Sequence, residues 1–357
     1  MEPNPNSNGT KAAGWLVALL LLCCAVTMPL LACAHRFVTT PVAPAEPVEI
    51  TIPAGASFRW TAKELTRRHV VDGELSFRVL AWIRGAEKHI KAGRYLFDKA
   101  ATPDVVLARL TSGDVFIEKI TIPEGYTIHD VAKRLAEKGR GTPDSILKIM
   151  EDPEFIRTAG LAGETSLEGY LFPATYDLPD GLSTEDFLKT MVREFLGRLN
   201  PALRQAAQER GLTLHQWVTL ASIIQKESGK EEEMPLISAV FHNRLKLGMP
   251  LQADPTVIYG LKKFEGKLTK RDLAADSPYN TYQIAGLPPG PIANPGLAAL
   301  SAAVCPAPVE YLYFVARGDG YHSFSGTLDE HNEAVRRYRK FQAERRAALP
   351  DNEAARK

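Results

Sequence analysis

The chain has 357 residues, of which 45% are hydrophobic and 24% are charged, a composition typical of globular proteins with room for two domains. Lys and Arg number 43 against 42 Asp and Glu, which excludes a strongly basic nucleic-acid-binding protein, and we expect no nucleic-acid partner. Three of the four cysteines lie in one apolar stretch and only Cys305 lies in the polar remainder, which excludes a disulfide framework and a zinc site.

An apolar stretch over residues 12–34 carries no charged side chain and follows a short segment, residues 1–11. A helix rises about 1.5 Å per residue, so this stretch can cross a hydrocarbon core of about 30 Å, and we predict a transmembrane anchor. A lipoprotein signal is the alternative, because Leu30 to Cys33 resemble a bacterial lipobox that would place a lipid on Cys33. The proline-containing residues 35–47 are typical of an extended linker.

Two copies of a strand–turn–helix pattern follow the linker. In the first, residues alternate between apolar and polar from Val48, turn at Pro-Ala-Gly, and become helical after Ser57. The pattern returns from Ile120, with Thr127 at the position of Ser57, and both side chains are suited to cap a helix N-terminus. This repeat predicts a module of βα units over residues 48–140.

The pattern beyond residue 140 is mostly helical. We predict an α+β protein, with a mixed α+β domain over residues 141–345 and a C-terminal tail over residues 346–357. Within that domain the sequence predicts helices over 184–199, 213–226, 235–247 and from Leu328, and a strand over 311–315.

Glu227 is the candidate acid. On a helical wheel it falls on the apolar side, near Leu220, Ile223 and Ile224. Loss of solvation there should raise the pKa of the carboxyl towards that of a general acid, which glycosidic cleavage needs. The alternative is a Glu that turns to solvent at a helix end. Glu231 to Glu233 are predicted to form a solvated run.

Polar and aromatic side chains between residues 241 and 296 are candidates to line a sugar-binding groove. Amides, hydroxyls and aromatic faces hold sugars, and Pro- and Gly-rich loops can approach a ligand closely. Each residue alone has a structural alternative: Asp254 in a turn, Asn294 as a helix cap, and Tyr279 or Tyr282 in the core. The candidates are Asn243, Gln252, Asp254, Tyr259, Tyr279, Asn280, Tyr282 and Asn294.

The segment Ala221–Ser228, the polar segments just described, and His322-Ser323-Phe324 ahead of His331-Asn332 together closely resemble the YceG-like endolytic murein transglycosylases. The resemblance implies that Glu227 is the catalytic residue and adds His322 to the candidate substrate-binding residues. Many relatives have Glu at the position of Gln225, so in this chain Glu227 is the one carboxylate of the motif.

The resemblance, which extends from the membrane segment to about Phe341, also implies a location and a substrate. It implies a short cytoplasmic N-terminus, a single-pass anchor in the cell inner membrane, a LysM-like module over 48–140 and a periplasmic catalytic domain. The implied reaction cleaves the MurNAc–GlcNAc bond of nascent peptidoglycan strands to give 1,6-anhydro-MurNAc ends and to terminate strand elongation. Peptidoglycan synthases are the implied protein partners.

Two other functions are compatible with the same residues. A hydrolase of the lysozyme type would use Asp254 or Glu168 as the second carboxylate that its chemistry requires. A non-catalytic scaffold would bind glycan or a synthase through the βα units and would tolerate the loss of Glu227. The sequence contains no phosphate-binding loop, dinucleotide fingerprint, zinc-ligand spacing or nucleophile elbow, so no cofactor or metal is predicted.

Overall fold

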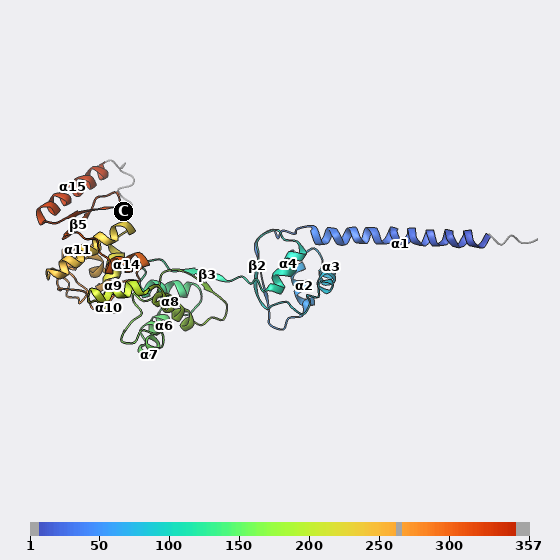
Figure 1. The fold of residues 1–357 in the computed structure, drawn as a ribbon, viewed down its shortest axis with the longest axis horizontal. Helices are drawn as coiled ribbons and strands as arrows, with labels where there is room; N and C mark the ends of the chain where they lie inside the picture. The colour runs from blue at the N-terminus through green and yellow to red at the C-terminus, as the bar shows by residue number, and fades with distance from the viewer. Residues whose placement is uncertain (1–6, 262–265, 348–357) are drawn as a thin grey trace, which may run out of the picture. The chain divides into compact units, whose positions relative to one another are not determined.

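The computed structural model describes residues 7–261 and 266–347, and it divides into two units between residues 118 and 119 (Figure 1). Each unit has its own hydrophobic core. The module predicted over residues 48–140 therefore extends across the division. The predicted N-terminal segment 1–11 and tail 346–357 lie partly outside the described residues.

The first unit begins with a long helix, α1 (Ser7–Thr39), which includes Pro29. It continues past the predicted anchor into the predicted linker before it ends. Of the helices in the described residues, one is long and apolar enough to cross a membrane, namely Leu21–Thr39 of α1, with a mean hydropathy of 1.7 and none of its window buried.

After α1, the first unit has the order strand, helix, helix, strand, helix. The strands β1 (Val48–Ile52) and β2 (Gly93–Phe97) pair antiparallel, with Val48 opposite Phe97. The helices are α2 (Phe58–Arg67), α3 (Glu74–Ile83) and α4 (Pro103–Ser112). Ser57 caps α2 as predicted, because its hydroxyl accepts from the Trp60 amide at 3.2 Å.

The second unit is mostly helical. Among the described residues the chain has three two-stranded sheets, and two of them belong to this unit. Its mixed α+β character confirms the predicted fold class. Its elements are β3 (Glu118–Thr121), α5 (Ile128–Glu137), α6 (Pro143–Met150), α7 (Pro153–Thr158), β4 (Thr175–Leu178), α8 (Thr184–Arg198), α9 (Pro201–Glu209), α10 (Leu214–Glu227), η1 (Glu231–Glu233), α11 (Met234–Lys246), α12 (Asp254–Gly260), α13 (Lys270–Leu273), α14 (Leu297–Val304), β5 (Tyr313–Ala316), β6 (His322–Ser325) and α15 (Leu328–Ala347).

The second copy of the repeat belongs to this second unit. Thr127 caps α5 in a capping box with Asp130, as the pattern predicted, but the apolar side of the copy packs into the core of the second unit. Its turn touches the loop and the helix end beside the candidate acid. The Gly125 amide donates to the Asn294 carbonyl at 2.9 Å, and Lys226 Nζ donates to the Gly125 carbonyl at 3.4 Å.

Helix α10 is the central helix of the second unit. Its N-terminus is fixed by a capping box between Thr213 and Gln216, and every residue from Trp217 to Ile224 is buried. Trp217 Nε1 donates to the Leu300 carbonyl of α14 at 2.7 Å, so α10 is held along its length as well as at its start. The position of its last residue is therefore fixed by the core.

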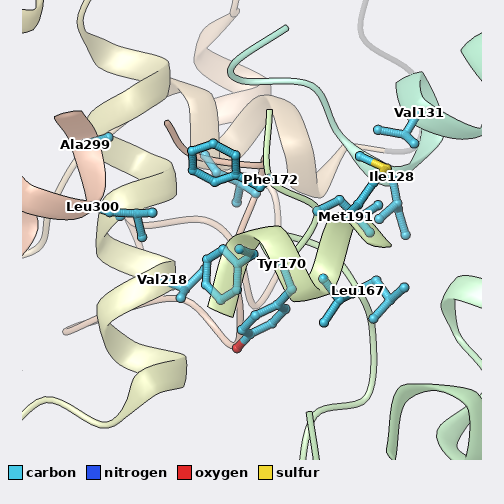
Figure 2. Close-up of a cluster of buried hydrophobic side chains, with 14 of the residues drawn as sticks. Ile128, Val131, Leu167, Tyr170, Phe172, Met191, Val218, Ala299 and Leu300 are labelled. Carbon is cyan, nitrogen blue, oxygen red and sulfur yellow. The ribbon is translucent and has the colours of Figure 1, made fainter. Parts of the chain in front are cut away.

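Buried side chains of the segment 167–172 fill the space beside α10. Figure 2 shows Leu167, Tyr170 and Phe172 between Val218 of α10 and the residues labelled on α5. The Tyr170 ring meets the Phe195 ring of α8 edge to face, with centroids 5.4 Å apart. The packing joins α5, α8 and α10 into one core.

Candidate active site

Glu227 is the last residue of α10 and is partly buried. The residues before it, up to Ile224, are packed into the core, so the backbone that carries the carboxyl is fixed. Burial, and to a smaller extent the negative charge of Asp254, raise its pKa from 4.5 to about 8. No hydrogen bond or salt bridge from another described residue stabilises the ionised form. The carboxyl is therefore mainly protonated at neutral pH, as the helical wheel predicted.

Glu227 opens into a pocket of about 350 Å³. The structure brings five of the predicted residues together there: Glu227, Gln252, Asp254, Tyr282 and His322. The pocket is also lined by six residues that the predicted set did not contain: Arg244, Leu251, Phe314, Val315, Ala316 and His331.

Asp254 and Tyr282 form a pair on the wall of this pocket. Asp254 is the first residue of α12, and its Oδ1 accepts a hydrogen bond from the Tyr282 hydroxyl at 2.7 Å. Burial and this hydrogen bond raise the pKa of Tyr282, so the phenol stays protonated and remains a donor. Asp254 thus has a fixed orientation while it stays exposed to the pocket.

Arg244 supplies a buried positive charge to the pocket. Its Nε donates to the Leu312 carbonyl at 2.7 Å, and its Nη1 donates to the Leu251 carbonyl at 2.9 Å. Nη1 also donates to Gln252 Oε1 at 3.2 Å. Gln252 has a φ of 53°, an unfavourable backbone conformation for a residue other than glycine, and such strain clusters at functional sites.

His322 is oriented by Glu233. Its Nδ1 lies 2.8 Å from Glu233 Oε2, and its backbone amide donates to Oε1 of the same carboxyl at 2.9 Å. The prediction that Glu231 to Glu233 form a solvated run is wrong for Glu233, which is buried because it pairs with β6. His331 also lines the pocket, and its Nδ1 is buried without a hydrogen-bond partner among the described residues.

Three predicted amides lie elsewhere and hold loops. Asn243 donates to the Val309 and Tyr311 carbonyls, each at 2.9 Å. Asn280 donates to the Ala275 carbonyl at 2.8 Å, and Asn294 accepts from the Leu171 amide at 2.9 Å. These side chains make hydrogen bonds to backbone within the protein, and sugar binding by the three residues stays a prediction.

Two predicted tyrosines also lie outside this pocket. The rings of Tyr259 and Tyr279 are 4.9 Å apart, and the Tyr259 hydroxyl donates to Glu168 Oε2 at 3.1 Å. Glu168 is buried, accepts from the Ile128 amide at 3.2 Å, and does not line the pocket with Glu227. Burial raises the pKa of Glu168 to about 8, as it does for Glu227, but the hydrogen bonds to Ile128 and Tyr259 show that this carboxyl holds the start of α5.

The sequence of the chain matches those of known proteins over most of its length. A sequence profile of the YceG-like family matches residues 50–337, which is more than half of the chain. The chain belongs to the YceG-like family. This confirms the resemblance drawn from the motif around Glu227.

Named relatives of this YceG-like chain are endolytic murein transglycosylases. That of Bacillus subtilis strain 168 is 35% identical over 306 residues, which cover 82% of this chain and 84% of the relative. That of Streptococcus pneumoniae strain D39 is 29% identical over 319 residues, which cover 81% of this chain and 58% of the relative. A crystal structure described as a yceG-like protein of Listeria monocytogenes has a TM-score of 0.58 and 34% identity, and the match covers 81% of this chain and 98% of that one.

The match to the YceG-like family includes every candidate site residue but begins after α1. The assignment of α1 therefore depends on its own length and composition. Among the described residues, no group of three or more His, Cys, Asp and Glu side chains is arranged to hold a metal ion.

Proposed function

We propose that this chain is an endolytic peptidoglycan lytic transglycosylase in which Glu227 acts first as general acid and then as general base. The observation that carries the proposal is a carboxyl with a pKa near 8 that faces an open pocket and has no protein partner among the described residues. The names of the relatives support the substrate class.

In the first step, the protonated Glu227 donates its proton to the oxygen that links MurNAc C1 to GlcNAc. The C1–O bond breaks, the GlcNAc hydroxyl leaves, and positive charge develops at C1. In the second step, the Glu227 carboxylate takes the proton of the MurNAc C6 hydroxyl while O6 bonds to C1. The acid is regenerated, no water is consumed, and the attack is intramolecular, so a second catalytic carboxylate is not required.

The other groups of the pocket act on charge and orientation. The Asp254 carboxylate, held by Tyr282, stabilises the positive charge at C1 and keeps Glu227 protonated before the reaction. Arg244 is a fixed donor to sugar or carboxylate oxygens, and it holds the loop that carries Gln252. His322, oriented by Glu233, presents its other ring nitrogen as a hydrogen-bonding group.

The mass of the products tests this reaction against hydrolysis. Digestion of isolated glycan strands should give anhydro ends that are about 18 Da, one water, lighter than hydrolysed ends, because O6 replaces water as the nucleophile. Mass spectrometry of the muropeptides distinguishes the two. Reducing MurNAc ends would contradict the proposal and would favour a hydrolase in which Asp254 activates water.

The pH dependence tests the assignment of the acid. Because Glu227 must carry its proton at the start, kcat/KM should fall about ten-fold per pH unit above about 8. Asp254→Asn removes the smaller of the two causes of the raised pKa, so this limb should move to lower pH. Initial rates measured from pH 5 to about 10 would show this shift of the alkaline limb. A limb that does not move in Asp254→Asn would mean that a group other than Glu227 titrates.

The Glu233–His322 pair tests the role of orientation. Glu233→Gln weakens a charge-assisted hydrogen bond and should lower kcat/KM by about ten-fold. Glu232→Gln is the matched control, because the neighbouring Glu232 accepts from the exposed Tyr321 hydroxyl at 2.9 Å and does not line the pocket. Rates should be compared well below both melting temperatures. Equal losses in the two variants would remove His322 from the mechanism.

We also propose that α1 anchors the chain in the inner membrane as a single span, with the catalytic domain in the periplasm. The length and hydropathy of α1 support a membrane segment. Lipidation of Cys33 is the alternative, and fatty-acid labelling that is lost in Cys33→Ala would establish it. A LysM-like, glycan-binding role for the βα module, strand termination and contact with peptidoglycan synthases belong to the same proposal.

A further inference from the structure

The first unit exposes one face of α3 that is strongly apolar. Leu75, Val79, Trp82 and Ile83 recur at the i, i+4, i+7 and i+8 positions and are 73%, 53%, 70% and 67% exposed. Their helix is held by other residues, since Phe77, Leu80 and Ala81 form the buried side. Large apolar side chains gathered on one exposed face mark an interaction surface rather than a folding requirement.

This face adjoins the end of the apolar segment of α1. Helices α1 and α3 are in contact, as their adjacent placement in Figure 1 also shows. Leu30, Cys33, Ala34 and Phe37 of α1, again spaced along one helical face, line a groove of about 580 Å³. The opposite wall of the groove is α3, including Leu75, Val79 and Ile83.

The occupant of this groove follows from its position along α1. Leu30 to Ala34 are the last residues of the uncharged stretch 12–34 that the proposed anchor places in the bilayer, so the α3 residues facing them lie at the membrane surface. The composition of the face fits that environment. Tryptophan favours the membrane interface, and Arg36, which lines the groove, can extend its charge to lipid headgroups.

We propose that the apolar face of α3 inserts into the outer surface of the inner membrane and binds phospholipid, so that the first unit is docked on the bilayer as well as tethered to it. The inference depends on the proposed anchor, because the anchor sets how far α3 lies from the bilayer. It does not depend on the catalytic reaction. A partly buried amphipathic helix of this kind gains free energy from the apolar area that it removes from water.

The test uses the full chain with its four native cysteines replaced by serine, reconstituted at one chain per lipid nanodisc of phosphatidylcholine and phosphatidylglycerol. An environment-sensitive NBD probe is attached at Val79→Cys. The control probe is attached at Ala54→Cys. Ala54 lies in an exposed turn just after β1, at the opposite end of the strand pair from the Val42–Ala101 bridge that follows α1. We expect a blue-shifted Val79 probe that nitroxide lipids quench several-fold more than the Ala54 probe.

A matched substitution separates lipid contact from a general change of the fold. With the probe kept at Val79, Leu75→Gln with Ile83→Gln should reduce the blue shift and the lipid quenching. Val105→Gln, which also replaces an exposed apolar side chain but on α4, should leave both unchanged. Equal quenching of the Val79 and Ala54 probes would overturn the proposal. So would a blue shift that appears only when two chains share a disc, which would assign the face to a second copy.

Failure of the anchor is measured separately. Resistance of the full chain to carbonate extraction from vesicles reports the span of α1, and release of anhydro-muropeptides from soluble glycan reports the reaction. A chain that resists extraction and cleaves glycan, but whose Val79 probe stays in water, would refute the lipid-binding face alone. A chain that carbonate removes would refute the anchor, and with it the position on which this inference depends.

Discussion

Glu227→Gln should abolish cleavage while leaving the fold intact. The amide keeps the size of the side chain and removes the proton that both steps require, so general acid–base loss predicts a fall of about 10² to 10⁴ in kcat. The product assay on isolated glycan strands measures it. Full activity of this variant would exclude the mechanism and would favour the scaffold alternative.

The same variant should be as stable as the native chain at neutral pH, or more stable. The folded-state pKa of Glu227 is about 8 against an ordinary value of 4.5, so between these pH values the folded chain keeps a proton that the unfolded chain releases. The carboxyl therefore contributes stability below pH 4.5 that is lost as pH rises through about 8. Glutamine removes this dependence, and thermal melting at pH 5 and at pH 8 should show a flatter profile for the variant.

Gln225→Glu is the matched control on the same helix. Gln225 Oε1 accepts a hydrogen bond from the Gly296 amide at 2.9 Å, and a glutamate oxygen can accept the same bond. The side chain is directed to that loop and does not line the pocket with Glu227. We therefore expect activity within a few-fold of the native chain. A large loss would mean that charge near the end of α10 matters in its own right.

Gly169→Ala should strongly destabilise the second unit, although it adds only one methyl group. Gly169 has a φ of +88°, and an added Cβ would lie 2.5 Å from Pro291 Cβ and 2.8 Å from Val218 Cγ1. Val218 is on the buried central helix, so neither neighbour can move freely. Positive φ and overpacking together predict a loss of about 2 to 5 kcal/mol in the free energy of unfolding. The melting temperature should fall by about 5 to 15 °C.

Gly163→Ala isolates the backbone contribution. Gly163 also has a positive φ, +98°, but an added Cβ there would meet nothing within 4 Å. The loss should be about 1 to 2 kcal/mol, from the backbone conformation alone. Differential scanning calorimetry on both variants gives the difference. Equal losses would mean that the contacts of Gly169 with Pro291 and Val218 relax without cost.

Local pattern was enough to predict the elements that carry the site. The caps Ser57 and Thr127, the helix that ends at Glu227, and the apolar side on which Glu227 lies all depend on residues close together in sequence. Such features follow from helical periodicity and the hydrogen-bonding needs of a first turn. The direction of the pKa shift of Glu227 could be predicted in part for the same reason, because Ile223 and Ile224, one turn before it, are buried.

Long-range contacts could not be predicted in this way. Glu233 looked like part of a charged surface, and only its pairing with His322, distant in sequence, explains its burial. The Asn294 side chain accepts from the Leu171 amide, a contact between segments far apart in sequence that no local pattern indicates. Arg244 could have been suspected, because it adjoins the candidate Asn243, yet nothing local indicates that a buried arginine would support the pocket.

The repeat shows the same limit at the level of domains. Two similar strand–turn–helix patterns suggested one module, whereas the structure assigns the copies to different cores. A sequence period reports that two segments adopt similar local structure. It does not report which larger core each segment joins, because that depends on residues outside the repeat such as Asn294 and Lys226.

The two copies of the repeat differ in what surrounds their turns. In the first copy, a side chain added at Gly55 would meet nothing within 4 Å, whereas at Gly125 it would lie 3.5 Å from Lys226 and 3.8 Å from Gln225. Both glycines have a positive φ, +80° at Gly55 and +75° at Gly125, so a side chain at either position strains the backbone. The second turn is also hydrogen-bonded to Asn294 and Lys226, so a change there reaches the end of the helix that carries Glu227, whereas a change in the first turn stays local to the first unit.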